Sequence, residues 1–309
     1  MAQKKKDSFL RAGEQQNLLI LKLQRLAWRL IAPLPDSLYI KIKYLSIKRK
    51  WPNIKNPKNF TEKIQYRKIH DRNPLYVKLA DKIEVKNYIK QRVGADFAIP
   101  TLWAGTRLED INWNDIPLPA VIKPNHTSGL GHFLHGNSDI EHLMRCDPVT
   151  DWLAIDHARY NREWAYSDIP RQAMIEPLLM RDGGVPWDYR CFVFHGKVVL
   201  VSVDVREDNH GYCANFSVDW SRLPFHDPHY FPPYKGDIPA PTALSTMVEL
   251  AETVAGDLDF VRVDFYDTGD HLYIGELTLY PGGGFEAFEP KEFDRWLGNH
   301  WTIRSTPAG

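Results

Sequence analysis

The stretch that most constrains the fold is FVRVDFYDTGDHLYIGELTLYPGGGF, residues 260–285. Two runs in which apolar and polar residues alternate flank a short polar segment, and this pattern predicts a β-hairpin followed by a glycine turn. Arg262 and Asp264 share one face of the first strand, and Glu276 and Thr278 share one face of the second. The hairpin therefore carries an arginine and two carboxylates whose relative position depends on the turn.

The turn decides whether the two acids meet. A loop of even length would send Asp264 and Glu276 to opposite faces, because a slip of one residue flips every side chain. We expect a three-residue loop with Gly269 in the left-handed conformation, which pairs Asp264 with Ile274 and leaves Glu276 diagonally across, at about 7–8 Å between Cβ atoms. Two carboxylates at that separation can share hard cations, which take oxygen ligands. The alternative is an ordinary surface hairpin with two solvated acids.

Composition describes a folded protein and excludes some partners. The chain has 309 residues, of which 43% are hydrophobic, so one large domain or two to three lobes can bury a core. The 39 basic and 39 acidic side chains cancel, and no bulk attraction to nucleic acid follows. Cys146, Cys191 and Cys213 are widely spaced and form no CxxC pair. This usage argues against a disulfide framework and favours a reducing cytosol.

The N-terminal segment is strongly basic. Within residues 1–50, twelve Lys or Arg stand against three acidic residues. Residues 17–31, NLLILKLQRLAWRLI, predict a basic amphipathic helix that is too short and too charged to span a bilayer. Such a helix can lie on an anionic membrane surface or pack on the core of its own protein, and the pattern leaves both open.

Two lysines occupy unusual places. Lys82 lies near the start of a helix predicted over residues 79–93, where a solvated helix charge is the ordinary interpretation. Lys123 interrupts the apolar strand AVIKP, which is costly unless the lysine faces solvent or holds an anion. The loop NHTSGLG follows, at residues 125–131. Its backbone N–H groups can form an anion-binding nest, although a short hairpin turn is the alternative.

Further along, residues 176–179 (EPLL) end an apolar strand with a proline bend, and Asp188 and Arg190 lie two apart on the strand WDYRCFVF. The order of these motifs resembles the TupA-like branch of the ATP-grasp superfamily, which is linked to teichuronopeptide and other cell-envelope polysaccharide biosynthesis. The resemblance covers about residues 56–300. It is carried by the segments NPKNFTEKIQYRKIHDRNPLYVKLADK, KPNHTSG, REWAY, DYRCFVFHGK, NFSVDWSRLPF, FVRVDFY and GELTLYPGGGFEAFEP.

The resemblance implies an α+β ATP-grasp fold in which two α+β subdomains grip ATP between them, behind a basic helical N-terminal extension. The implied boundaries are 1–55 for the extension, 56–118 for a helical pre-grasp region, 119–180 for the small subdomain, 181–300 for the C-terminal subdomain with the metal site, and 301–309 for a tail.

The resemblance also implies roles for residues at matching positions. The set expected to bind ATP is Lys82, Lys123, Ser128, Gly129, Gly131, Glu176, Leu178, Leu179 and Asp188. The set expected to hold the metal is Asp264, Glu276 and Thr278, with Thr278 standing where many ATP-grasp ligases have Asn. The catalytic set is Arg262, Lys123 and Arg190, in which Arg262 would stabilise negative charge on the transferring phosphoryl group. The local HTSG replaces the HGSG more usual in this branch, so Thr127 would stiffen the loop.

The implied reaction is ATP-dependent carboxylate–amine ligation through an acyl phosphate, with ATP and two Mg²⁺ ions, for which Mn²⁺ is a substitute. The implied substrates are a small-molecule carboxylate and an amine, with a lipid-linked saccharide as one acceptor, and the implied location is the cytoplasm at the membrane's inner face. Two alternatives stay open: an ATP-grasp kinase that phosphorylates a sugar hydroxyl, and a nucleotide-binding assembly factor without catalysis.

Overall fold

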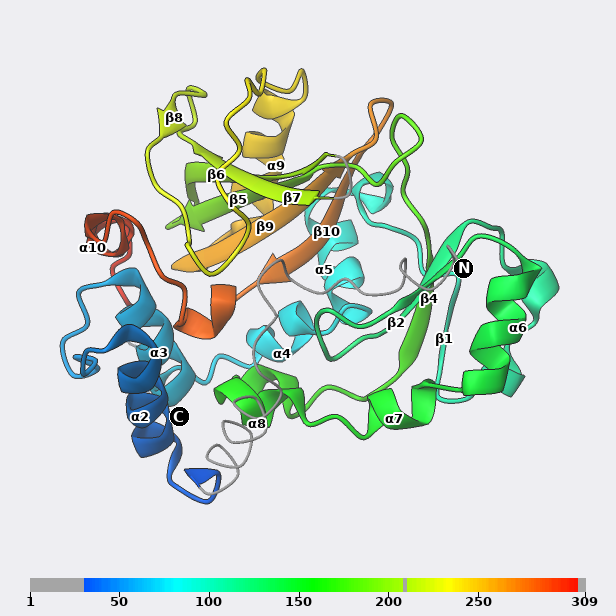
Figure 1. Ribbon diagram of the computed structural model, residues 1–309, viewed down its shortest axis with the longest axis horizontal. Coiled ribbons are helices and arrows are strands. Elements are labelled where there is room, and N and C mark those ends of the chain that lie inside the picture. Colours follow the sequence, from blue (N-terminus) through cyan, green and yellow to red (C-terminus); the bar gives the residue numbers. More distant parts are fainter. Residues whose placement is uncertain (1–30, 208–209, 305–309) are drawn as a thin grey trace.

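The computed structural model describes residues 31–207 and 210–304, which form two separate antiparallel sheets that lie next to each other (Figure 1). The α-helices are α2 (Asp36–Lys48), α3 (Phe60–His70), α4 (Leu75–Ala80), α5 (Glu84–Val93), α6 (Asn137–Cys146), α7 (Val149–Leu153), α8 (His157–Asn161), α9 (Leu244–Ala255) and α10 (Glu292–Asn299). Short 3₁₀ turns are η2 (Ala95–Phe97), η3 (Leu108–Asp110), η4 (Trp113–Asp115), η5 (Trp164–Tyr166) and η6 (Pro281–Gly284). Across residues 31–207 and 210–304, none of the helices has the length and apolar character that a membrane crossing requires.

The larger sheet has six strands in the order β10-β9-β5-β6-β7-β8. They are β5 (Asp188–Phe194), β6 (Lys197–Glu207), β7 (His210–Phe216), β8 (Arg222–Leu223), β9 (Phe260–Asp267) and β10 (Leu272–Thr278). Helix α9 places Met247, Leu250, Ala251 and Val254 on one buried stripe, and this spacing packs it against β5, β6 and β9. Figure 1 shows α9 above the sheet.

The smaller sheet has four strands in the order β1-β4-β2-β3. They are β1 (Trp103–Gly105), β2 (Ala120–Pro124), β3 (His132–Leu134) and β4 (Ala173–Pro177). This sheet has its own apolar core, which includes Ile122, Leu134 and Ile175. The core of the larger sheet is separate and contains Phe260, Val263 and Phe265. The two separate cores define two lobes, and charged side chains from both lobes meet between them.

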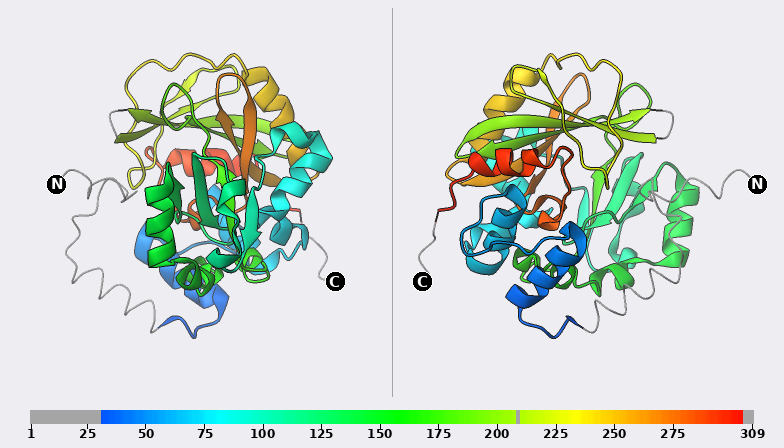
Figure 2. Two further views of the ribbon diagram at one scale, coloured as in Figure 1. Left: turned by 90° about the vertical axis from the view of Figure 1, so that its right-hand side faces the viewer. Right: turned by 60° about the vertical axis from the view of Figure 1, so that its left-hand side comes forward.

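Helices α2, α3 and α10 gather at one end of the larger sheet (Figure 2, right). Thr61 of α3 donates its backbone N–H (2.9 Å) and its hydroxyl (2.7 Å) to the carboxylate of Asp294 in α10. Phe60 packs edge-on against Phe260 at the start of β9, with ring centroids 5.0 Å apart. These contacts fix the N-terminal helices to the hairpin strand. Residues 17–30 of the basic segment lie outside the described residues.

Two boundaries differ from those expected. β1 lies within the range 56–118, yet it pairs with β4, so the smaller sheet extends across the boundary at 118/119. Trp301 falls at the start of the expected tail, but it is buried in the main core and packs against Phe260.

The prediction of a single helix over residues 79–93 is wrong, because the helix is interrupted between α4 and α5 at Asp81, Lys82 and Ile83. Asp81 causes the break by accepting the Ile83 N–H on its side chain at 2.9 Å.

The hairpin register also differs. β9 and β10 are joined by four residues, 268–271, and Ile274 pairs with Phe265 instead of Asp264. A bulge between Ile274 and Glu276 then adds the odd residue, so that Glu276 lies directly opposite Asp264 and Thr278 opposite Arg262. Gly269 does have a positive φ of 90°, as expected. The shared face is confirmed, but the bulge that creates it sits at Gly275 and not in the turn.

Candidate active site

The hairpin holds its polar side chains in one hydrogen-bonded network. Arg262 donates to both carboxylate oxygens of Asp264, at 2.7 and 2.5 Å, and its Nη2 also donates to the Thr278 hydroxyl at 3.1 Å. The Thr278 hydroxyl donates to Oε1 of Glu276 at 3.0 Å. The contact from Arg262 to Thr278 crosses from β9 to β10, and it requires the register produced by the bulge at Gly275. One guanidinium therefore fixes both carboxylates relative to each other.

The two carboxylates differ in their electrostatics. Burial raises the pKa of Asp264 to about 6, and the charge of Arg262 opposes that rise. Burial also disfavours ionisation of Glu276, but the positive charges of Lys82 and Arg262 outweigh it, and the pKa of Glu276 falls to about 2. Lys123 contributes to the same lowering. The charge of Lys123 on the smaller sheet therefore reaches Glu276 on the larger sheet.

Lys82 is positioned by the break between α4 and α5. Its backbone N–H donates to the Asn125 carbonyl at 3.1 Å, and the Asn125 side-chain amide donates to Asp81 at 2.9 Å. These bonds tie the junction to the loop that follows β2. The Lys82 ammonium lies 4.0 Å from Oε2 of Glu276. The structure thus brings Lys82 from the helical region to the hairpin face that carries Glu276.

Lys123 belongs to a buried cluster with two other charged residues. Glu176 of β4 forms ion pairs with Lys123 of β2 and, at 2.6 Å, with Lys86 of α5. The Glu176 side chain is only 4% exposed, whereas 24% of the Lys123 side chain is exposed. Burial opposes ionisation of Glu176, but the two lysines outweigh it and keep its pKa below its ordinary value. Glu176 therefore acts through its side chain as an anchor for Lys123.

The loop after β2 changes from buried to exposed along its length. Asn125 and Thr127 are buried, while Ser128, Gly129 and Gly131 are exposed. Gly129 has a φ of +75°, a conformation that disfavours other residues. At Gly131 a Cβ would lie 3.1 Å from the Ile122 carbonyl, so a glycine permits the chain to return close to β2. The described contacts join none of the three exposed residues to the hairpin.

The expected adenine-reading segment lies at the end of β4. The Leu178 N–H donates to the Pro119 carbonyl at 3.0 Å, so that donor is already engaged. No described residue accepts from the Leu179 N–H in the backbone contacts, and Pro177 has no N–H to give. If this segment reads a heterocycle through its backbone, Leu179 is the donor that remains for it.

Asp188 and Arg190 form part of a second charged cluster, next to the first. Arg190 donates to Asp188 at 2.7 and 2.9 Å and pairs with Asp204 at 2.6 Å. Tyr230 donates to Asp204 at 2.7 Å and lies 3.1 Å from Nη2 of Arg190. Arg190 is also 4.0 Å from Asp264, which links the two clusters. The contacts of Arg190 are thus to carboxylates of its own sheet, which hold it beside the hairpin face.

The donor set on the hairpin fits a hard divalent cation. Oε2 of Glu276 accepts no hydrogen bond from a described residue, and its low pKa keeps it ionised at neutral pH. Carboxylate and hydroxyl oxygens are the ligands that Mg²⁺ takes, usually with substrate phosphates completing the shell. Among residues 31–207 and 210–304, no group of three or more His, Cys, Asp or Glu is placed to hold a metal without such help.

Several charged residues of the site were not among those predicted from the sequence. Asp204 interrupts the apolar strand VVLVSVDV just as Lys123 interrupts AVIKP, so the same signal was available. Lys86 follows Lys82 by four residues, but in a helix this spacing is too common to single it out. Tyr230 lies in the irregular segment 224–236, and nothing in its local sequence indicates a contact with Arg190.

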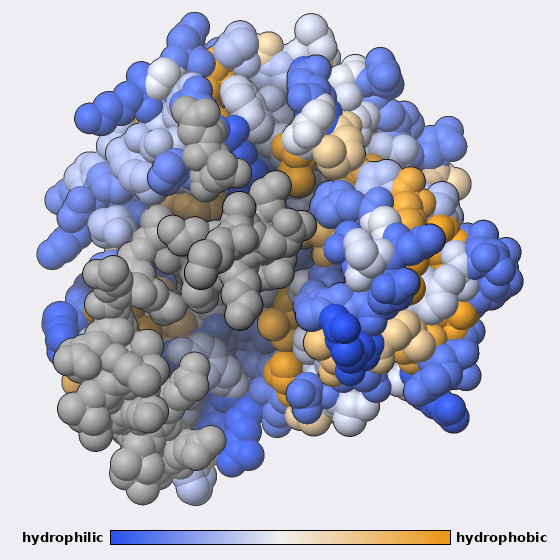
Figure 3. Space-filling model, turned by 45° about the vertical axis from the view of Figure 1, so that its right-hand side comes forward, coloured by the Kyte–Doolittle hydropathy of each residue, from blue (hydrophilic) through white to orange (hydrophobic). Residues whose placement is uncertain are grey.

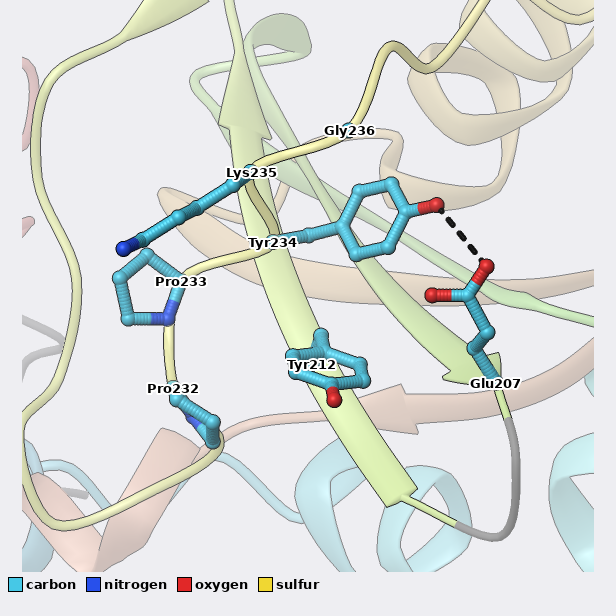
Figure 4. Close-up of a pocket in the computed structure, with 7 residues that line it drawn as sticks. All are labelled: Glu207, Tyr212, Pro232, Pro233, Tyr234, Lys235 and Gly236. Atoms are coloured by element: carbon cyan, nitrogen blue, oxygen red, sulfur yellow. Dashed lines mark hydrogen bonds between the residues drawn. The ribbon is translucent and has the colours of Figure 1, made fainter.

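A separate open pocket of about 400 Å³ lies between the end of β6, β7 and residues 232–236 (Figure 4). Its lining consists of Glu207, Tyr212, Pro232, Pro233, Tyr234, Lys235 and Gly236. The Tyr234 hydroxyl points to the Glu207 carboxylate at 3.4 Å, and Lys235 points away from both (Figure 4). No residue of the expected site lines this pocket.

The surface in Figure 3 is mostly hydrophilic, with apolar patches on the right of the view.

Lys82 from the junction of α4 and α5 and Lys123 from the smaller sheet both act on Glu276 of the larger sheet, an arrangement expected of an ATP-grasp protein. A family model described as TupA-like ATPgrasp matches residues 62–302. The chain therefore belongs to the TupA-like ATP-grasp family, as its motifs predicted. No curated protein matches the sequence.

Solved structures with a similar chain path are distant in sequence. D-alanine–D-alanine ligase from Bacillus anthracis has 16% identity and a TM-score of 0.42, over 65% of this chain and 57% of the ligase. L-amino acid ligase from Bacillus licheniformis has 11% identity and a TM-score of 0.44, over 72% of this chain and 49% of that one. N5-carboxyaminoimidazole ribonucleotide synthetase has 14% identity and a TM-score of 0.43, over 71% of this chain and 50% of the synthetase. The chain thus spans only about half the length of these proteins.

Proposed function

We propose that this protein is an ATP- and Mg²⁺-dependent carboxylate–amine ligase that acts through an acyl phosphate. The observation that carries the proposal is the network of Arg262, Asp264, Thr278 and Glu276, facing Lys82 at 4.0 Å. It sits within the region of the chain that matches the ATP-grasp family. Positive charge and hard oxygen ligands on one surface are what a nucleoside triphosphate with its cation requires.

The residues divide the work between the two sheets. Lys82 and Lys123 bind phosphate oxygens, and Arg262 stabilises the charge that develops as the γ-phosphoryl group passes to the carboxylate. Asp264 and Glu276 would hold Mg²⁺, which when bound would offset negative charge on the phosphate oxygens. Thr278 orients Glu276 through its hydroxyl. Arg190, beside Asp264, steadies the same face from the neighbouring strand.

The remaining assignments follow the same proposal. Ser128, Gly129 and Gly131 close over the phosphates and exclude water that would hydrolyse the acyl phosphate. The segment 176–179 receives adenine, and Asp188 lies near the ribose. The acceptor is a cell-envelope polysaccharide or peptidyl precursor, to which an amino acid or other amine is added. Residues 17–31 bring the enzyme to the cytoplasmic face of the membrane.

The test is product analysis with purified protein. Protein is incubated with ATP, Mg²⁺, a panel of uronic acids and N-acetyl amino acids, and a panel of amino acids. We expect ADP and inorganic phosphate only when both substrates are present, and a product mass equal to the two substrates minus water. Asp264→Asn should abolish this turnover because it removes a metal ligand and the partner of Arg262. A product that gains phosphate would identify a kinase, and release of AMP would refute the proposal.

A further inference from the structure

Helix α2 carries apolar side chains on its outer face as well as on its inner face. On the inner face, Tyr39, Ile40 and Tyr44 are buried. On the outer face, Leu38 and Leu45 are seven residues apart and therefore lie on one line along the helix, and they are 39% and 41% exposed. A surface helix of a globular protein ordinarily places polar residues there. The outer face of α2 is therefore suited to a further contact.

The inner face of α2 is already engaged with the rest of the molecule. The Tyr44 hydroxyl shares a hydrogen bond of 2.9 Å with the Thr61 hydroxyl of α3. The Tyr39 hydroxyl donates to the Tyr160 carbonyl at 3.0 Å. Figures 1 and 2 show α2 at an outer edge of the molecule. The outer face is thus presented from a helix whose orientation is fixed.

A tryptophan and several cations extend this outer face. Trp51 follows the end of α2 and is 51% exposed, and Arg49 and Lys50 beside it are exposed as well. Within the part of the chain that the structure describes, no carboxylate forms an ion pair with Lys41, Arg49 or Lys50. We refer to the following residues together as the α2 face: Leu38, Lys41, Leu45, Arg49, Lys50 and Trp51. Exposed leucines and tryptophan among lysines and arginines are typical of a helix that lies in a membrane interface.

Charge indicates which partner this face would accept. Residues 37–58 contain seven Lys or Arg and no acidic residue, and Asp36, at the start of α2, is paired with Arg162 at 3.2 Å. A second copy in a two-fold contact would bring the basic face against itself. Residues 1–30 are also basic, with seven Lys or Arg against two acidic residues. Like charges disfavour both of these partners, whereas an anionic surface complements the face.

We propose that the α2 face binds an anionic lipid surface. Its two leucines and Trp51 enter the boundary between headgroups and acyl chains, and Arg49 and Lys50 contact lipid phosphates. This contact is separate from the one proposed for residues 17–31, and it does not depend on the ligase reaction. Because the inner face of α2 is fixed, the contact holds the whole molecule in one orientation on the membrane.

The test is co-sedimentation of the full-length protein with vesicles of phosphatidylcholine, either alone or mixed with phosphatidylglycerol. We expect binding to the mixed vesicles only, and weaker binding as salt is added. The apolar variant is Leu38→Gln with Leu45→Gln, which keeps helix propensity, and the charge variant is Arg49→Gln with Lys50→Gln. Each should weaken binding by at least about 10-fold, because one cation at an anionic surface contributes about five-fold.

The matched control is Met144→Gln with Arg145→Gln, on helix α6 of the smaller lobe. Met144 is 38% exposed, close to the value for Leu38, so its replacement removes a similar apolar surface. This control should bind vesicles as the wild type does. The contribution of residues 17–31 is measured in the full chain with Lys22→Gln, Arg25→Gln and Arg29→Gln. In that background the charge variant should still weaken binding.

The inference is overturned if the apolar and charge variants bind the mixed vesicles as the wild type does, or lose no more binding than the control. It is also overturned if the wild type is a dimer that the apolar variant converts to a monomer in light scattering, because a second copy then covers the face. A large loss of stability in urea, confined to the apolar variant, would show that residues 1–30 cover it and would overturn the inference as well. Formation of ADP with soluble substrates tests the ligase function separately, so failure of one proposal is distinguishable from failure of the other.

Discussion

The buried cluster of Lys123, Glu176 and Lys86 allows a quantitative test of how the smaller sheet holds Lys123. Glu176→Gln keeps the size of the side chain and removes its charge. The side chains of Lys86 and Glu176 are 6% and 4% exposed, so water cannot replace the lost partner. Among the described residues, Lys86 would retain only the Thr101 hydroxyl, at 2.8 Å. The variant therefore leaves a buried ammonium without a counter-charge.

The expected loss of stability follows from the burial of Lys86. Removal of one partner from a buried ion pair costs about 3–5 kcal/mol. Lys86 can also escape by losing its proton, which at pH 7 costs about 5 kcal/mol for a group with an ordinary pKa of 10.5, at about 1.4 kcal/mol for each pH unit. The loss of the ion pair between Glu176 and Lys123 adds little to the change in stability, because 24% of the Lys123 side chain is exposed and water screens its charge. We therefore expect a loss of about 3–5 kcal/mol.

The measurement is urea unfolding followed by circular dichroism, at pH 7 and at higher pH. Burial already lowers the pKa of Lys86, and removal of Glu176 would lower it further. The unfolded variant then binds more protons than the folded one, so its stability rises with pH and its deficit narrows toward the ordinary pKa of lysine. Lys86→Met in the Glu176→Gln background should restore part of the loss.

The control for this cluster is Glu252→Gln. Glu252 pairs with Lys197 at 2.7 Å, but the Lys197 side chain is 78% exposed, so the expected change is below about 1 kcal/mol. The reasoning would be refuted if Glu176→Gln cost no more than Glu252→Gln, if its deficit were independent of pH, or if Lys86→Met gave no recovery.

Two further predictions concern the hairpin. Gly275→Ala places a Cβ 2.5 Å from the Tyr266 ring, and this clash should lower the free energy of unfolding in urea by about 1–3 kcal/mol. Because the bulge at Gly275 aligns the two carboxylates, the variant should also lower Mg²⁺-dependent ATP turnover. Gly184→Ala, with only a 3.8 Å contact, is its control, and equal losses would contradict the bulge argument. The Arg67 side chain is 1% exposed and forms an ion pair with Asp259 at 2.5 Å, just before β9. Asp259→Asn should therefore lower the free energy of unfolding by about 3–5 kcal/mol. If the effects of Asp259→Asn and Arg67→Met were additive in a double-mutant cycle, the pair would not be coupled.

The order of motifs along the chain predicted the family, and the cost of burying a charge in a strand selected Lys123. Both inferences use information that lies within a few residues of each motif. Alternation in a strand is a local property, and it predicted that Arg262 shares a face with Asp264 and Glu276 with Thr278. The shared face of Asp264 and Glu276 required an odd residue between the strands in addition. The roles of these residues in binding ATP and metal stay predictions until turnover is measured.

What local sequence could not supply is the partner of each buried charge. Glu176 lies 53 residues from Lys123 and 90 from Lys86, and only the pairing of β2 with β4 and the placement of α5 bring the three together. The position of the bulge could not be predicted for a similar reason. A glycine at 269 and a glycine at 275 both supply an odd residue, and the choice between them depends on the Tyr266 ring of the facing strand, which occupies the space beside Gly275.

The two clusters indicate how the fold keeps so many charges beside one another. Each arginine on the hairpin side is matched to carboxylates of its own sheet: Arg262 to Asp264, and Arg190 to Asp188 and Asp204. The lysines at the phosphate side are held by Glu176 and Glu276, one on each sheet. An arriving triphosphate would therefore displace weak contacts such as the 4.0 Å approach of Lys82 to Glu276, and leave the short buried pairs intact. Lys82 can therefore move to the ligand while Arg262 and Arg190 keep their carboxylate partners.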